Sequence, residues 1–139
     1  MQSLAALLEE GFTEGKDLNC AESILYGGNQ AYELGLDESS LNLAAGFGGG
    51  MGIEATCGAL TGSIMVLSSL FVEDRAHDSR IYDIDEKFLR EFEEKMGSID
   101  CTPLKEGYRS EKRGCRDVIL AAAEVLDDVL EEELGGLEG

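Results

Sequence analysis

Apolar side chains recur every three or four residues along most of the chain, which is the spacing of an amphipathic helix. The first such pattern covers residues 4–12 and ends at Gly15. A second helix is expected to begin near Cys20, because Asn19 is a favourable N-cap and Glu22 stands at the capping-box position. The N-terminal part of the chain is therefore predicted to form two helices.

The middle of the chain predicts a glycine-rich loop followed by a buried helix. Gly35 is expected to end the second helix, and Asp37 is expected to cap a short one. Residues 46–52, Gly-Phe-Gly-Gly-Gly-Met-Gly, are too rich in glycine for a helix and are predicted to be a loop. Thr56 then caps a helix over residues 57–72 that is apolar on most of its circumference, so this helix should lie at the centre.

Three more helices are expected towards the C-terminus. Residues 79–96 carry one apolar stripe on an otherwise charged surface. Thr102 and Pro103 predict the cap and the first position of the next helix, which Gly107 ends. The last helix should begin near Cys115, and its apolar stripe is the most regular in the chain.

The pattern as a whole predicts an all-α fold. No segment alternates between apolar and polar residues with turn signals on both sides, as a half-buried strand would. We therefore expect a single compact bundle of about five to seven helices around the buried helix 57–72. The chain has 139 residues, of which 43% are apolar, so residues 1–139 fit one domain with its own core.

The charge of the chain argues against some partners. Acidic residues outnumber basic ones by 29 to 11, which gives a net charge of −18. Such a charge repels phosphate backbones and anionic lipids, so we expect no nucleic-acid partner and no membrane insertion. An acidic excess of this size also occurs in proteins adapted to a salty cytoplasm. The lone histidine, His77, stands among charged residues and is expected on solvated surface.

Four cysteines, Cys20, Cys57, Cys101 and Cys115, are the residues to which we assign the chemistry. The N-terminus lacks the basic region of a signal peptide, so the protein is expected in the cytoplasm, where thiols are reduced, metal-bound or cycling. Intervals of 36, 43 and 13 residues separate them, so there is no Cys-x-x-Cys pair. Each is expected at or just before a helix N-terminus, where N–H groups and the helix dipole stabilise a thiolate. Since a compact bundle can bring several N-termini to one end, the four sulfurs are expected to converge; the alternative is that each is a small buried apolar residue.

The glycine-rich segments have two interpretations. Phosphate binding is the first, but the loop follows an expected helix and no Gly-Lys-Ser/Thr ends it. We expect instead that Gly48, Gly49, Gly50 and Gly58 let the backbone approach the cysteine sulfurs or a group bound to them. Gly58 and Gly62 are four residues apart, which predicts a close contact of the central helix with another helix.

The cysteine and glycine segments together resemble a known family, named after four cysteines around a Cys-Gly-Ala-x-x-Gly core and described as redox-active. The resemblance covers nearly the whole chain. The matching segments are 19–23 (Asn-Cys-Ala-Glu-Ser), 46–52, 56–62 (Thr-Cys-Gly-Ala-Leu-Thr-Gly), 97–101 (Gly-Ser-Ile-Asp-Cys) and Cys115. The resemblance implies a cysteine-based redox role in which Cys20, Cys57, Cys101 and Cys115 occupy the positions of the family's four cysteines.

Four hypotheses about function stay open. The first, which we prefer, is electron transfer through an iron–sulfur cluster bound by all four thiolates, the usual ligand set. The second is a dithiol–disulfide oxidoreductase without a cofactor, in which Cys57 attacks as a thiolate and a neighbouring cysteine resolves, with Cys57 and Cys20 as the catalytic residues. The third is a structural zinc site, and the fourth is a non-redox module whose acidic face binds a basic partner. The partner in the redox cases would be an unidentified redox protein, and a homodimer stays open.

Overall fold

The computed structural model describes residues 1–137, which contain seven α-helices and no β-strand. The α-helices are α1 (Leu4–Glu9), α2 (Cys20–Ala31), α3 (Glu38–Leu41), α4 (Gly58–Phe71), α5 (Ile81–Met96), α6 (Cys101–Tyr108) and α7 (Arg116–Glu133). Three short irregular helical turns join them: η1 (Asn42–Phe47), η2 (Gly50–Glu54) and η3 (Ala76–Asp78). The prediction of an all-α bundle is confirmed.

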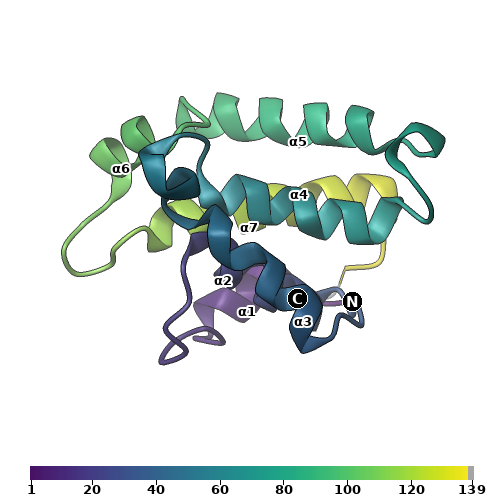
Figure 1. Cartoon of the computed structure of the whole chain (residues 1–139), viewed down its shortest axis with the longest axis horizontal. Helices are drawn as coiled ribbons and strands as arrows, with labels where there is room; N and C mark the ends of the chain where they lie inside the picture. Colours follow the sequence, from purple (N-terminus) through teal and green to yellow (C-terminus); the bar gives the residue numbers. More distant parts are fainter. Residues whose placement is uncertain (138–139) are drawn as a thin grey trace.

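Helix α4 lies at the centre, as its apolar circumference predicted. It packs against α2, α5 and α7, and only Ser69 among its residues is exposed. Figure 1 shows α4, α5 and α7 lying lengthwise along one side of the molecule, with α1, α2 and α3 on the other. Within residues 1–137, no helix combines the length and the apolarity that crossing a bilayer requires.

The helices on either side of α4 bury the stripes that the sequence showed. Ile81, Ile84, Phe88 and Phe92 form the buried face of α5. Helix α7 buries most of its apolar residues, including Leu126 and Leu130, which are fully inaccessible. Each such side chain contributes about 1.5–3 kcal/mol when it leaves water, so these stripes hold the bundle together.

Two helix starts were predicted correctly down to their hydrogen bonds. Asn19 accepts a hydrogen bond from the Glu22 backbone N–H, and the Glu22 side chain accepts one from the Asn19 N–H, which is a complete capping box. Asp37 accepts from the backbone N–H of Ser40 at 2.8 Å and caps α3. The hydrogen bonds that Asp37 accepts from Ser40 and Ser39 lower the pKa of its carboxyl.

Other helix boundaries differ from the prediction. Helix α1 ends at Glu9, well before Gly15, because Gly11 adopts a φ of +95°. The N-cap of α4 is Cys57 instead of Thr56, which pairs with Asp100 in an isolated antiparallel bridge. This pairing also makes Asp100 the N-cap of α6, so Thr102 and Pro103 lie inside that helix and Cys101 is its first residue.

A single carboxylate joins α1, α2 and α7 at the end of the bundle away from the cysteines. Asp127 in α7 accepts hydrogen bonds from the Ser3 hydroxyl at 2.7 Å and from the backbone N–H groups of Leu4 and Ala5 at 2.8 and 3.1 Å. It also accepts from the Tyr32 hydroxyl, just after α2, at 2.6 Å. Burial and the charge of Asp127 raise the pKa of Tyr32 far above its usual range, which keeps the hydroxyl a donor. We call these five residues the Asp127 cluster.

Candidate functional site

Two backbone hydrogen bonds bring Cys57 and Cys101 together. The Cys57 N–H donates to the Ile99 carbonyl at 2.9 Å, and the Cys101 N–H donates to the Ala55 carbonyl at 2.6 Å. Segments 55–57 and 99–101 therefore run antiparallel to each other. Because both segments lead directly into helices, this pairing places the starts of α4 and α6 at the same end of the bundle.

A close crossing of α2 and α4 brings Cys20 to the same end. A Cβ atom on Gly62 would lie 2.7 Å from the carbonyl oxygen of Ala21, and one on Gly58 would lie 2.9 Å from the carbonyl oxygen of Phe47. The predicted close helix contact at these glycines is thus confirmed. Since Ala21 follows Cys20, the crossing holds Cys20 beside the start of α4.

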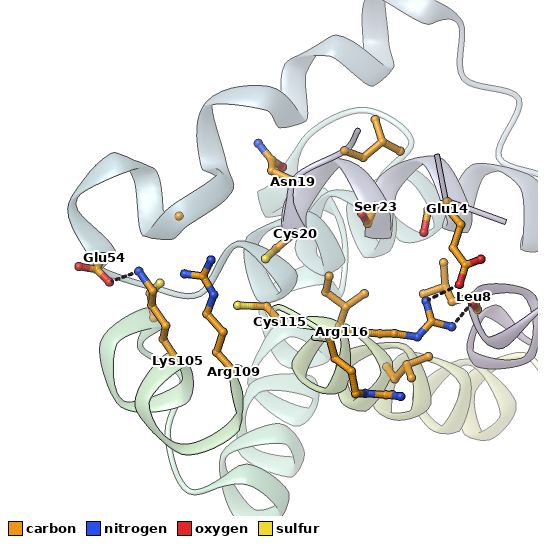
Figure 2. A pocket seen from close by; sticks show the side chains of 17 residues that line it. Leu8, Glu14, Asn19, Cys20, Ser23, Glu54, Lys105, Arg109, Cys115 and Arg116 are labelled. Carbon is orange, nitrogen blue, oxygen red and sulfur yellow. Dashed lines mark hydrogen bonds and ion pairs between the residues drawn. The ribbon is translucent and has the colours of Figure 1, made fainter. Parts of the chain in front are cut away.

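Cys115, the N-cap of α7, completes the group. Among the other three cysteines it has the largest effect on Cys20, whose pKa it raises, and Figure 2 shows the two side chains reaching into the same part of a cavity. Cys57 and Cys101 are also close enough for their charges to act on Cys20. The structure therefore gathers all four cysteines, which are free thiols, from four separate helix starts.

The cavity beside the cysteines has a volume of about 460 Å³. Cys20, Cys101 and Cys115 line it, whereas Cys57 does not and is only 5% exposed. Leu18 and Ile119 contribute to an apolar wall. Three thiols are thus reachable from the cavity, and the fourth lies in the core.

Cys20, Cys57 and Cys101 are less acidic than their helix starts predicted, because the pKa of each is raised. Burial raises the pKa of Cys57 to about 11, although the N–H groups of Ala59 and Leu60 act in the opposite direction. Burial, followed by the neighbouring Cys115, raises the pKa of Cys20 to about 12. The pKa of Cys101 is also raised, mainly by burial. The expected helix-start effect is present at Cys57, but the loss of water around the thiol outweighs it.

The glycines assigned to cofactor binding serve mainly the packing of the backbone. Gly49 lines the cavity, whereas Gly48, Gly50 and Gly58 do not. A side chain on Gly48 would collide with Asn19, and one on Gly50 would come within 2.9 Å of the Cys101 Cβ. These glycines therefore let the loop close over the starts of α2 and α6, where it comes into contact with Cys101 but leaves Cys20 and Cys115 open to the cavity.

The residue types at the site suit a metal ion, but their present arrangement does not. Four thiols are the ligands that zinc and iron–sulfur clusters use. As the side chains stand, however, residues 1–137 contain no group of three or more His, Cys, Asp or Glu arranged to hold a metal ion. The assignment of Cys20, Cys57, Cys101 and Cys115 as metal ligands, and of Cys57 and Cys20 as catalytic residues, stays a prediction.

Basic side chains on the cavity wall are the feature that sequence reasoning missed. Lys105, Arg109, Arg113 and Arg116 line the cavity, together with two carboxylates, Glu14 and Glu54. A signal was present in the sequence, because residues 105–116 hold five of the 11 lysines and arginines of a very acidic chain. His77, by contrast, is exposed as expected.

A helical bundle that collects four free thiols beside a cavity defines a class of protein, one whose chemistry depends on cysteine sulfur. The chain belongs to the family described as "Putative redox-active protein (C_GCAxxG_C_C)", whose model matches residues 18–129. It is also similar to an uncharacterized protein of Archaeoglobus fulgidus, with 28% identity over 130 residues that cover 83% of this chain and 86% of the relative. No solved structure matches the chain.

Proposed function

We propose that the protein is a thiol-based redox protein in which Cys20 and Cys115 form the pair that gives up and takes up electrons. The observation that carries this proposal is that both thiols line one accessible cavity, and Figure 2 shows their side chains reaching into the same part of it. Neighbouring thiols need only a small movement to form a disulfide bond. The sequence predicted that Cys57 attacks as a thiolate stabilised by its helix start. Cys57 is less suited to this role, because it is buried and its pKa is raised.

The roles of the two cysteines follow from their surroundings. Burial and the neighbouring Cys115 raise the pKa of Cys20, which keeps Cys20 protonated, so we assign the attack to Cys115. The Cys115 thiolate attacks one sulfur of a partner disulfide, which forms a mixed disulfide and releases one partner thiol. Cys20 then loses its proton and attacks the Cys115 sulfur, which releases the second partner thiol. Two electrons pass from the protein to the partner, and the two protons end on the released thiols.

The test is a redox titration of protein purified without oxygen. The protein is equilibrated in mixtures of reduced and oxidised dithiothreitol, the remaining thiols are blocked, and the peptides are mapped by mass spectrometry. We expect one two-electron couple that links Cys20 to Cys115, and the same couple in a Cys101→Ser control. A protein whose thiols stay reduced throughout, or whose disulfide joins Cys57 to Cys101, would overturn the assignment.

A second candidate is electron transfer through an iron–sulfur cluster, the function that the cysteines of the sequence favour. The gathering of four thiols at one end of the bundle supports it, because Cys57 and Cys101 have no role in the dithiol exchange. The four cysteines would hold the cluster, which would supply one-electron chemistry when bound. Iron and acid-labile sulfide in the oxygen-free sample would favour this candidate, whereas zinc alone would favour a structural site. Either thiol-based role suits the reducing cytoplasm.

A further inference from the structure

We propose that the cavity beside the cysteines binds a small organic disulfide that carries carboxylate groups, and that Arg109 holds one of these carboxylates. The inference rests on the proposed function for its chemistry, because it names the substrate class of the same thiol pair. The prediction that a carboxylate binds Arg109 depends only on the side chains that line the cavity, and not on the thiol chemistry.

The charge of the cavity is opposite to that of the protein. Over the whole chain 29 acidic residues face 11 basic ones, but the cavity wall has four basic side chains and two carboxylates. The negative charges elsewhere on the surface are screened over about 10 Å at 0.1 M salt. A small anion inside the cavity therefore interacts mainly with the basic wall, whereas a large acidic protein would also face the repelling surface.

Arg109 is the basic residue that is left available for a ligand. Lys105 pairs with Glu54 at 3.0 Å, Arg113 with Asp117 at 2.7 Å, and Arg116 donates to the Leu8 carbonyl at 2.9 Å. Among residues 1–137, Arg109 has neither an ion-pair partner nor a side-chain hydrogen bond. In the view of Figure 2 its guanidinium group lies beside the side chains of Cys20 and Cys115, which line the same cavity.

The guanidinium group of Arg109 suits a carboxylate in particular. Its planar donors match the two oxygens of a carboxylate, so one residue can both attract and orient the ligand. The volume of about 460 Å³ lies within the range of roughly 300–1,000 Å³ that is usual for small-molecule sites. Apolar residues, including Leu18 and Ile119, can cover the carbon skeleton of the ligand.

The reaction that follows is the exchange described above. The carboxylate on Arg109 would place a ligand sulfur near Cys115, whose thiolate displaces the first ligand thiol. Cys20 displaces the second. One disulfide is reduced to two thiols, and the Cys20–Cys115 pair is oxidised to a disulfide, so atoms and electrons balance without another reagent.

The first measurement tests binding without any redox step. S-methylglutathione has the carboxylates of glutathione but no reactive sulfur, and its binding can be followed by calorimetry at low ionic strength. We expect Arg109→Gln to weaken binding about tenfold, the usual cost of losing a hydrogen bond between charged groups. The control is Arg90→Gln, which removes an exposed cation on α5 that pairs with Glu86, and it should leave binding unchanged. Absence of binding, or equal binding by wild type and Arg109→Gln, would overturn the inference.

The second measurement compares the rates at which two disulfides oxidise the Cys20–Cys115 pair. Arg109→Gln should slow the reaction with oxidised glutathione about tenfold and leave the reaction with uncharged 2-hydroxyethyl disulfide unchanged. If Arg109→Gln changes neither of the two oxidation rates, the thiol function stands and this inference fails. If S-methylglutathione binds but neither reagent forms the disulfide, the proposed function fails, and a disulfide is the wrong substrate class.

Discussion

Helices α2 and α7 run between two polar regions of the molecule. The two regions differ in how many of their polar side chains have a hydrogen-bond or ion-pair partner. Their N-terminal ends present Cys20 and Cys115, whereas the Asp127 cluster joins Tyr32, just after α2, to the second half of α7. Asp127 accepts four hydrogen bonds from backbone and side-chain donors. At the other end the four cysteines are free and Arg109 lacks a partner within residues 1–137.

This difference separates the part of the protein that stabilises the helix packing, which we call the frame, from the part to which we assign function. A partly buried carboxylate that accepts four hydrogen bonds adds stability and fixes geometry, so the Asp127 cluster holds α1, α2 and α7 in place. Thiols and a cation without partners add little to stability. Their arrangement is useful only when another molecule, electron or proton arrives, which is why we assign function to the cysteine end.

Replacing Cys115 should have the largest effect on function and little effect on the fold. In Cys115→Ser, Cys20 loses the thiol with which we propose it forms a disulfide, so the reversible two-electron couple should disappear. The free energy of unfolding should change by no more than about 1 kcal/mol, because the side chain is half-buried and serine is similar in size. Thiol titration and urea denaturation measure the two effects. A couple that survives through another cysteine would show that the pair is misassigned.

Replacing Asp127 should have the opposite result. Asp127→Ala leaves the Tyr32 hydroxyl and the first N–H groups of α1 without their acceptor, so it should destabilise the protein by about 3 kcal/mol. The Cys20–Cys115 couple should persist in the folded protein. The neighbouring Asp128 is exposed, and Asp128→Ala should change stability by less than about 0.5 kcal/mol in the same urea titrations. Equal losses of stability in the two variants would show that the Asp127 cluster does not stabilise the helix packing.

The crossing of α2 and α4 belongs to the frame although it lies near the cysteines. Gly62→Ala would place a methyl group against the Ala21 carbonyl and should cost about 2 kcal/mol, because two backbones must separate. The matched control is Gly107→Ala in α6, where nothing lies within 4 Å of the added Cβ. It should stabilise the protein by up to about 1 kcal/mol, since alanine favours a helix. Thermal unfolding of both variants decides whether the close contact matters.

The smallest expected effect is a loss of stability at alkaline pH. The pKa of Cys57 is about 11 in the folded protein and has an ordinary value of 9.0. The contribution of this thiol is therefore fully present below pH 9 and is lost as the pH rises towards 11, because the unfolded chain releases the proton first. Between pH 8 and pH 10 the loss should be about 1 kcal/mol. Urea titrations of wild type and Cys57→Ala should show a shallower decline in the variant, and parallel declines would contradict the burial of this thiol.

The amino-acid sequence alone determined the secondary structure and the candidate chemistry. Helical periodicity, the Asn19 capping box and the Asp37 cap are local signals, because each depends on residues within one or two turns of the chain. The glycine pair at Gly58 and Gly62 also marked the close crossing. The four cysteines stood out by their number and by their places near helix starts, and the family to which the chain belongs was recognised from these segments.

Only the tertiary structure decided which groups meet and how acidic they are. The pairing of Thr56 with Asp100 moved two helix starts, and no local pattern announces a partner more than 40 residues away. The placement of Cys20 and Cys115 on one cavity wall, the burial of Cys57 and the position of Arg109 all depend on how helices from distant segments pack. A pKa responds to burial and to neighbouring charges, and both are fixed by three-dimensional packing and not by the order of residues.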